Sequence, residues 1–398
     1  MVQNLLSLGE IKMKKRFSFI FILLMLLFLG VSCSKDNKQE SSSKEMVEIT
    51  DMVGRKINVL PGSYSKVVCI GAGALRMYSY VGDLDKLSGV EDIDNETAAG
   101  RPQMFDAVAR PYFIAGKDVF KTLPSAGKGG PQAQAAEPEK ILNCNPDIII
   151  SEYEDVDKAN ALQTQIKVPV IVVKYGYSGV FDNFVKNSIT LLGKVFDKEA
   201  KANTLNSFID SEKAEIEKRV SNIDKSLQSK VYICGLGNWG TTDHLQTAQN
   251  YAPFNVAKIN NVVTDLARDG IQGIEKEKFI ELSEKMDIMI IDAAAIKNIK
   301  KLSSDDLNII KSTKAWQNDE VYLQMAYNAY YTNLEIALCN TWFNAKVIYP
   351  ELFNDIDINT KLNQITKVFL GKELANEINS YPMSFKGYGK IDREKIFS

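Results

Sequence analysis

Histidine is almost absent from this chain of 398 residues, in which His244 is the single example. A metal site built from three histidines of one chain is therefore excluded, and a hydrolytic triad with histidine would have to use His244. An excess of basic charge is missing too, since 48 lysine and arginine residues face 50 aspartate and glutamate residues. This balance gives no reason to expect nucleic-acid binding. The apolar share of 45% is that of a folded globular protein, which excludes a disordered chain.

Long apolar runs are also missing. The longest covers residues 17–31, about 15 residues, whereas about 20 are needed to cross a bilayer. Basic residues precede it and small residues end it, as in a secretory signal peptide. We therefore expect residues 1–32 to be a signal peptide, with Met1 or Met13 as its start.

The end of this run suggests a lipid anchor. Residues 29–33 (LGVSC) resemble the lipobox of bacterial lipoproteins, although Gly30 stands where leucine is usual. We expect Cys33 to carry the lipid and the polar residues 33–46 to form a flexible tether. The protein would then be exported and anchored to a membrane, facing the periplasm or the cell exterior. The alternative is an ordinary cleaved signal with an incidental cysteine.

Cysteine gives no further site. Cys69, Cys144, Cys234 and Cys339 are widely spaced, without a CxxC pair or another metal-ligand pattern. Cys69 and Cys234 lie within apolar runs, which is typical of small buried thiols. A disulfide stays open as an alternative outside the cytoplasm, but the spacing favours no pair.

Short apolar runs alternate with longer amphipathic segments, the pattern of parallel α/β layers. The expected strands are residues 66–70, 87–90, 147–151 and 170–174 in the first half, and 230–234, 287–292 and 320–323 in the second. Between the halves, residues 181–228 lack proline and carry apolar residues at helical intervals, so one long helix is the simplest interpretation. Gly193 and Asp197 are the points where it could break.

These observations predict two Rossmann-like α/β lobes with mainly parallel sheets. The first lobe would cover residues 47–178, the interlobe helix 179–228, and the second lobe 229–398. Ligands of open α/β sheets bind beyond the carboxyl ends of the strands, so we expect a ligand cleft between the lobes. The halves also repeat a unit, because residues 139–150 and 277–291 each read as a helix that leads into a buried strand opening with aspartate.

Several segments together resemble the solute-binding lipoproteins of ABC importers that handle iron–siderophore complexes, haem and cobalamin. The resemblance begins at residues 49–55 (ITDMVGR), similar to the opening hairpin of that family. It continues through residues 66–70, 139–149, 168–172 and 188–193, and spans roughly residues 47–395. It implies a rigid pair of lobes with a small hinge motion, and a protein that binds without performing chemistry or holding a cofactor.

The loops after the strands are the candidate ligand-binding segments. The ligand-binding residues that we expect are Arg76, Tyr153, Tyr175, Tyr177, Asn238, Trp239, Thr241, His244, Tyr327, Asn328, Tyr330 and Tyr331. Aromatic rings offer flat apolar faces to a macrocycle or a catecholate, and tyrosine hydroxyls can donate to ligand oxygens. Tyr327, Tyr330 and Tyr331 also fit a helical stripe, which is more often core packing. Arg101 and Arg110 are further cations that could meet an anionic complex or remain solvated.

The resemblance also implies partners. In importers of this type, an acidic residue on each lobe commonly docks on arginines of the permease. By position, Glu139 fits this role in the first lobe and Glu277 in the second, with Glu275 as an alternative. We therefore expect a monomer that binds a small-molecule metal complex and delivers it to a permease dimer with its ATPase.

Motifs that suggest an enzyme are weaker evidence than the resemblance to binding proteins. Residues 235–240 satisfy GxGxxG after a strand, but a polar loop-like stretch follows where a dinucleotide site needs a helix. Residues 125–130 are similar to a phosphate loop whose lysine lacks the following serine or threonine. Asp243 and His244 could serve an exported hydrolase, but no GxSxG elbow accompanies them. The expected function is capture of an iron(III)–siderophore or similar chelate. Cobalamin or haem binding, a hydrolase, or a surface lipoprotein without ligand are the alternatives.

Overall fold

The computed structural model describes residues 45–131, 133, 135–237 and 242–396. The expected signal peptide and Cys33 lie outside these residues, as does most of the tether. In the part of the chain that is described, no helix combines the length and the apolar composition needed to cross a membrane.

The first lobe is built on a four-stranded parallel sheet in the order β4-β3-β5-β6. Its strands are β3 (Val67–Ile70), β4 (Leu87–Gly89), β5 (Ile148–Ser151) and β6 (Val170–Val172). A hairpin of β1 (Val47–Thr50) and β2 (Lys56–Val59) precedes the sheet. Its turn is closed by an ion pair of 2.9 Å between Asp51 and Arg55. The strands are almost wholly apolar and buried, as expected for a parallel sheet covered on both faces.

The second lobe is built on a five-stranded sheet in the order β13-β12-β11-β7-β9. Its strands are β7 (Lys230–Cys234), β9 (Asn260–Asn261), β11 (Ile288–Asp292), β12 (Val321–Gln324) and β13 (Gly389–Lys390). All pairs are parallel except the one that β13 makes with β12. A small antiparallel pair joins β8 (Gln246–Thr247) to β10 (Gln272–Gly273). All seven strands expected from the sequence are present, with ends shifted by one or two residues at most.

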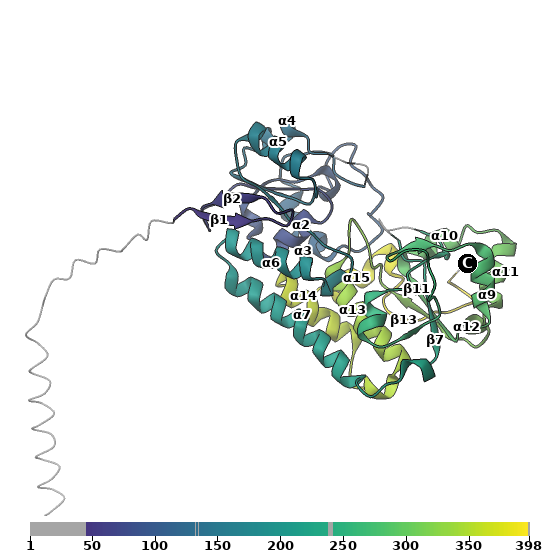
Figure 1. Ribbon diagram of the computed structural model, residues 1–398. Coiled ribbons are helices and arrows are strands. Elements are labelled where there is room, and N and C mark those ends of the chain that lie inside the picture. The colour runs from purple at the N-terminus through teal and green to yellow at the C-terminus, as the bar shows by residue number, and fades with distance from the viewer. Residues whose placement is uncertain (1–44, 132, 134, 238–241, 397–398) are drawn as a thin grey trace, which may run out of the picture. The chain divides into compact units, whose positions relative to one another are not determined.

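Helices surround both sheets (Figure 1). In the first half they are α2 (Ala74–Val81), α3 (Pro111–Phe120), α4 (Pro138–Asn143), α5 (Val156–Ile166), α6 (Asn183–Val195) and α7 (Glu199–Arg219). In the second half they are α8 (Ala252–Val256), α9 (Lys276–Ser283), α10 (Ala293–Ile299), α11 (Ser304–Ser312), α12 (Lys314–Gln317), α13 (Leu334–Ile348), α14 (Ile358–Leu370) and α15 (Ala375–Ser380).

The segment between the lobes differs from the expected single helix. A turn separates α6 from α7, and the two helices run side by side (Figure 1). Asp197 adopts a left-handed backbone conformation in this turn, with φ of 56°, which an α-helix does not tolerate. Gly193 lies within α6 and lets α7 approach, because a Cβ there would lie 2.6 Å from that of Ala202. The long connection is therefore α7 alone, with α6 folded back against it.

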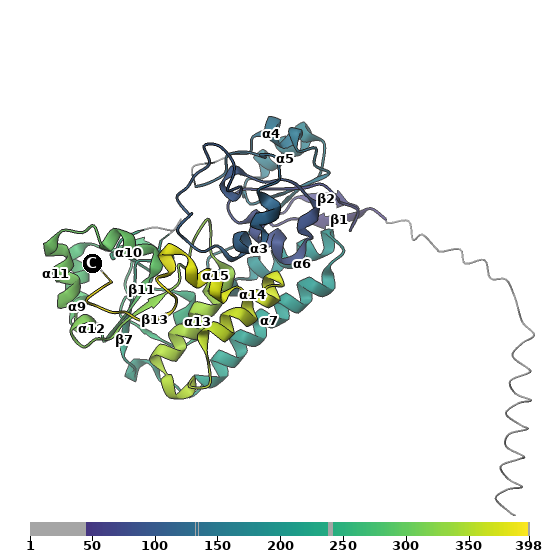
Figure 2. The ribbon, with the colours of Figure 1, turned by 180° about the vertical axis from the view of Figure 1, so that it is seen from behind.

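The C-terminal helices pack against elements of both lobes. Helix α13 is buried along most of its length, and α14 packs on both α13 and α7 (Figures 1 and 2). Phe369 of α14 meets the ring of Tyr80 of α2 at 5.0 Å, and Lys372 donates to the carbonyl oxygen of Ala115 in α3. Residues 229–398 are therefore not one separate lobe, because their C-terminal helices complete the first lobe as well. One hydrophobic core runs through both halves.

Candidate functional site

A cavity of about 310 Å³ lies where loops of the two halves meet at the carboxyl ends of the strands. The loop after β6 contributes one wall and the loop after β12 contributes another, together with residues that follow β8 and residues 270–271. The lining residues are Gly176, Tyr177, Gly179, Ala248, Asn250, Tyr251, Ala252, Gly270, Ile271, Tyr327, Asn328, Tyr331 and Thr332. We call this cavity the cleft. Its position agrees with the place where ligands bind in α/β sheets.

A second cavity of about 270 Å³ adjoins the cleft and shares Gly176, Tyr177 and Tyr331 with it. Its other lining residues follow β5 and β6: Glu152, Tyr153, Glu154 and Lys174. We call it the side pocket. The expected residues Tyr153, Tyr177, Tyr327, Asn328 and Tyr331 are thus brought together in these two cavities, while their contact with a ligand stays a prediction.

Tyrosine rings dominate the walls. Tyr331 stacks on Tyr175 with ring centroids 4.3 Å apart, and Tyr251 meets Tyr327 edge to face at 5.1 Å. Tyr175 itself is buried, lines neither cavity and donates to the carbonyl oxygen of Gly73 at 2.9 Å, so it supports the wall rather than forming it. Burial raises the pKa of Tyr327 and Tyr331 well above the ordinary range. These hydroxyls therefore stay protonated at neutral pH and can act as hydrogen-bond donors. Tyr177 is 91% exposed at the rim, where its ring can cover a bound molecule.

The loop that carries Tyr177 has a fixed shape. Both backbone N–H groups of Tyr177 and Ser178 donate to one carboxylate oxygen of Asp182 at 2.9 Å, and the other oxygen caps α6. Gly179 has φ of 58°, and a Cβ on it would lie 2.2 Å from the hydroxyl oxygen of Tyr327. Only glycine fits this close approach, so the rim loop that carries Tyr177 and the side chain of Tyr327 keep a fixed relative position.

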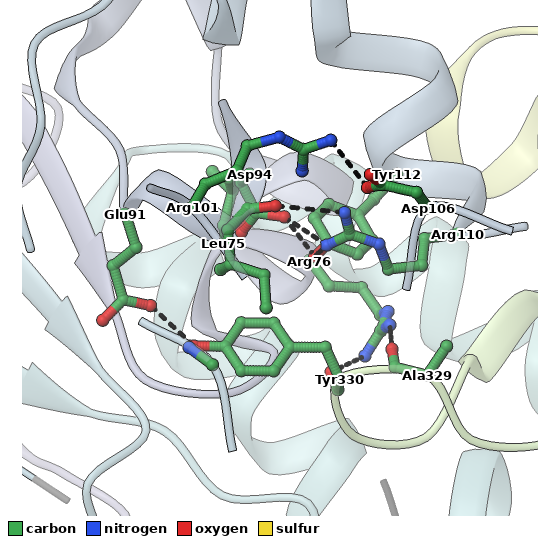
Figure 3. Close-up of polar contacts among 12 residues, drawn as sticks. Leu75, Arg76, Glu91, Asp94, Arg101, Asp106, Arg110, Tyr112, Ala329 and Tyr330 are labelled. Atoms are coloured by element: carbon green, nitrogen blue, oxygen red, sulfur yellow. Dashed lines mark hydrogen bonds and ion pairs between the residues drawn. The ribbon is translucent and has the colours of Figure 1, made fainter. Parts of the chain in front are cut away.

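Arg76 lines neither the cleft nor the side pocket but lies at the contact between the lobes. Its side chain is fully buried, and the guanidinium donates to the carbonyl oxygens of Ala329 at 2.6 Å and Tyr330 at 3.0 Å and to Oδ1 of Asn333 at 3.0 Å (Figure 3). The ring of Tyr112 lies 4.7 Å away. Arg76 therefore holds the loop after β12 against the first lobe, which corrects its assignment as a cation facing the ligand.

Tyr330 belongs to the same interlobe contact rather than to the cleft wall. Its hydroxyl donates to Oε2 of Glu91 at 2.7 Å and accepts from the backbone N–H of Gly130 at 3.0 Å (Figure 3). Burial raises the pKa of Glu91 to about 7, opposed by the hydrogen bonds from Tyr330 and from the Gly71 N–H. Tyr330 and Tyr331 both have positive φ, 53° and 73°, a strained conformation that these contacts keep in place.

Sequence reasoning missed Glu91, Glu152 and Tyr251. Glu91 follows the expected strand 87–90, and this position after a strand was the signal that could have found it. Glu152 directly follows β5, so its position after a strand is the same kind of signal. Tyr251 follows the short strand β8, which no run of apolar residues announces.

His244 is also buried away from the cleft. Its ring packs edge to face on Phe279 at 5.0 Å, and burial lowers the pKa of its imidazole. The neighbouring Asp243 carboxylate accepts from the backbone N–H of Leu245 at 2.9 Å. The two side chains therefore do not form the acid and base of a triad, and His244 is placed as a core residue rather than a ligand contact.

The other arginines of the first lobe are paired. Arg110 forms an ion pair of 2.5 Å with Asp94, and Arg101 one of 2.6 Å with Asp106 (Figure 3). Arg101 lines a separate cavity of about 550 Å³, made by residues 100–104, 128–131, 133, 135 and 137 of the first lobe. The glycine loop 125–130 borders that cavity, and Gly127, Gly129 and Gly130 have positive φ.

The remaining expected residues lie outside the cleft or outside the described part. Asn238, Trp239 and Thr241 fall among residues that the structure does not describe. The carbonyl oxygen of Gly237 accepts from the Nδ2 group of Asn328 at 2.7 Å, which places Gly237 beside the cleft lining. Glu139 and Glu277 are exposed in the first turns of α4 and α9. Glu275 precedes α9 and is also exposed.

Metal ligands are not clustered. Among the described residues, no group of three or more histidine, cysteine, aspartate or glutamate side chains could hold a metal ion. Cys69, Cys144, Cys234 and Cys339 are all buried and free.

The periplasmic binding protein family defines the class of this molecule. The model of that family matches residues 67–326, and the chain belongs to it. A search among curated proteins gave no match.

Solved structures share the fold. A periplasmic solute-binding protein from Veillonella parvula aligns with a TM-score of 0.64 at 18% identity, over 85% of this chain and 96% of that one. The molybdate-binding protein MolA of Haemophilus influenzae gives 0.63 at 15% identity, over 82% and 98%. CeuE of Helicobacter pylori with Ni(II) bound gives 0.54 at 16% identity, over 82% and 96%.

Membership of the family establishes the broad function. The chain is the substrate-binding protein of an ABC importer, an exported and non-enzymatic component that takes up a small molecule and works with a permease and its ATPase. The dinucleotide-site and hydrolase alternatives are thereby set aside.

Proposed function

We propose that this protein captures an iron(III)–siderophore or similar iron chelate in the cleft and delivers it to its permease. The observation that carries the proposal is the cleft itself, with tyrosine rings from both lobes and protonated hydroxyls at the strand ends. Such walls suit a bulky complex with flat apolar faces and peripheral oxygens. The side pocket extends the room available beyond the 310 Å³ of the cleft.

Two of the similar structures carry metal species, molybdate in MolA and Ni(II) in CeuE. This agrees with a metal-containing ligand without specifying it. Haem held by a histidine ligand is disfavoured, because His244 is buried against Phe279 and does not line the cleft. Cobalamin, whose metal is already enclosed by its macrocycle, is the alternative that the cleft leaves open.

The proposal also includes a lipid anchor and a docking face for the permease, which is marked by Glu139 and Glu277. Cys33 carries the lipid, residues 33–46 tether the monomeric protein to the membrane, and residues 1–32 are removed as signal peptide. Glu139 on α4 and Glu277 on α9 meet arginines of the permease. Both glutamates are exposed in first turns of helices, on the matching helix–strand units of the two lobes.

Native mass spectrometry of residues 34–398, incubated with an extract of the source cells, tests the ligand. A bound iron chelate supports the proposal, whereas a corrinoid or haem replaces it. Tryptophan fluorescence adds a solution readout, because Trp316 and Trp342 are buried in the core and do not line the cleft. A ligand-dependent signal is therefore expected from Trp239, and Trp239→Phe should remove it. A protein that binds none of these complexes would contradict the proposal.

A further inference from the structure

The two lobes repeat one surface motif, on helices α4 and α9. Residues 139–142 read Glu-Lys-Ile-Leu, and residues 277–280 read Glu-Lys-Phe-Ile. In both motifs the glutamate is exposed in the first turn of its helix, the lysine is partly buried, the third residue is buried and the fourth is exposed. Leu142 is 48% exposed and Ile280 is 46% exposed. The two motifs therefore agree in their pattern of exposure as well as in sequence.

The buried third residue fixes how each helix faces. Ile141 packs in an apolar core of the first lobe and Phe279 in one of the second, and both are fully buried. Residues three apart lie on the same face of a helix. The glutamate and the exposed apolar residue of each motif therefore share the outer side of their helix. The first patch is Glu139 with Leu142, and the second patch is Glu277 with Ile280.

The lysine of each motif is held by a carboxylate outside the patch. Lys140 pairs with Glu137 at 3.0 Å, and Lys278 pairs with Asp265 at 3.3 Å and with Glu281 at 3.1 Å. A basic group of a partner can therefore approach the patch glutamate without displacing the neighbouring lysine from it. Each patch offers one negative charge beside one apolar side chain.

Both motifs begin at the edge of their sheets where the cleft lies. Pro138, at the start of α4, lines a small cavity with Ser151 and Tyr153 at the end of β5. The N–H of Ile274, just before α9, donates to the carbonyl oxygen of Leu245 in the loop after β7 at 3.0 Å. The first turns of both helices thus lie toward the carboxyl ends of the strands. A partner that touches both patches reaches from one lobe to the other past the cleft (Figure 1).

An exposed apolar residue needs no explanation when it stands alone. Here, however, two of them occupy the same position of a repeated motif, each beside an equally placed glutamate. Exposed ion pairs contribute little to affinity, and charges at the rim of an interface mainly speed association. An apolar side chain that is enclosed at the centre of an interface contributes much more. The glutamates alone therefore do not account for a lasting complex, whereas the complete patches do.

Resting on the proposed function, we propose that Leu142 and Ile280 are the apolar anchors of the permease interface. Each anchor inserts into an apolar pocket beside a basic residue of one permease subunit. Because the two patches are alike, the complementary surface occurs twice on the partner, as on a two-fold symmetric dimer. The anchors set the lifetime of the complex, and the glutamates set the rate at which it forms.

Binding kinetics separate these two contributions. Residues 34–398 are measured against the permease–ATPase complex of the importer, held in lipid nanodiscs, at low and at high salt. Leu142→Ala and Ile280→Ala should each raise the dissociation rate by about fivefold or more at either salt concentration. Glu139→Gln and Glu277→Gln should mainly lower the association rate, and added salt should reduce that effect.

Two further variants serve as controls. Leu227→Ala is the matched control, because Leu227 is exposed but lies outside both motifs, just before β7, and it should leave both rates unchanged. Leu142→Met keeps an apolar side chain and should retain slow dissociation. Thermal unfolding followed by circular dichroism verifies that each variant is folded.

Three outcomes would overturn the inference. Unchanged dissociation rates in folded Leu142→Ala and Ile280→Ala would overturn it alone, since ligand capture would stand. Self-association that Leu142→Ala abolishes, with importer binding unaffected, would assign the first patch to a second copy of this chain. Failure of the unchanged protein to bind the importer complex would overturn the docking part of the proposed function as well.

Discussion

The hydroxyl of Tyr330 donates to the carboxylate of Glu91 across 2.7 Å, although the two residues are separated by 239 positions in the chain. Tyr330 comes from the loop after β12 of the second lobe, and Glu91 follows β4 of the first. Arg76 donates two hydrogen bonds to the same loop, to the backbone carbonyl oxygens of Ala329 and Tyr330. The lobes are thus joined beside the cleft by a buried polar contact, in addition to the helices that connect them.

Tyr330→Phe should lower the free energy of unfolding by about 1–3 kcal/mol, because it removes a hydrogen bond to a buried carboxylate and leaves the N–H of Gly130 unpaired. Urea denaturation monitored by circular dichroism measures the change. Tyr177→Phe is the matched control, since Tyr177 is exposed, and it should shift stability by less than about 0.5 kcal/mol. Equal stability of the two variants would contradict a structural role for the Tyr330 contact.

Glu91 should make stability depend on pH. Its pKa is about 7 in the folded protein, above the ordinary value near 4.3 expected for the unfolded chain. Between these values the folded state binds more protons, so the free energy of unfolding should fall as pH rises from about 4.5 to about 7. Asp292, whose pKa burial also raises to about 7, contributes in the same direction.

Urea titrations at several pH values measure this slope. Each group should contribute roughly 3 kcal/mol across the window. Glu91→Gln should remove about half of the slope, because Asp292 still contributes, and its amide oxygen can still accept from the Gly71 N–H. Glu139→Gln, which removes an exposed carboxyl group, should keep the slope. A Glu91→Gln profile as steep as that of the unchanged protein would remove Glu91 as the source.

Gly179→Ala should weaken ligand binding. The added Cβ would lie 2.2 Å from the hydroxyl oxygen of Tyr327, so this ring, which lines the cleft, must shift. Gly371→Ala is a stringent control, because Gly371 has φ of 74° and no atom within 4 Å of the position of its Cβ. Both variants should lose about 1 kcal/mol through backbone strain, but only Gly179→Ala should raise the dissociation constant of the ligand. An equal affinity in both would place Tyr327 outside ligand contact.

Charge reversal on the docking face should separate uptake from binding. Glu139→Lys and Glu277→Lys are expected to reduce uptake by cells while the purified variants bind ligand as before, because both side chains are exposed and distant from the cleft lining. Glu351→Lys, exposed after α13, provides the control. Normal uptake with both glutamates reversed would remove them from the docking role.

The strands were predictable because parallel strands buried on both faces appear as short continuous apolar runs. Residues 230–234 coincide with β7, and the other strands differ only at their ends. The break between α6 and α7 was less visible, because periodic apolar positions continue through both helices. The sequence marked Gly193 and Asp197 as points where the helix could break, and the positive φ of Asp197 shows that the chain reverses there.

The residues of the candidate ligand site were harder to predict from the sequence than the strands. The tyrosines of the loops after β6 and β12 could be named, since position after a strand identifies a cleft loop. The fate of Arg76 could not, because its partners are backbone carbonyl groups more than 250 positions away, and carbonyl groups leave no mark in a sequence. The pairing of Glu91 with Tyr330 depends on the same long-range contact.

The return of α14 and α15 to the first lobe has a consequence for how the molecule unfolds. Phe369 and Ile378 belong to one apolar core together with Tyr80 and Val67, so the first lobe is incomplete until the last part of the chain is in place. Independent melting of two lobes would expose this shared core on both sides. Calorimetry should therefore record a single cooperative transition, and removal of residues beyond 357 should destabilise the lobe farthest from them in sequence.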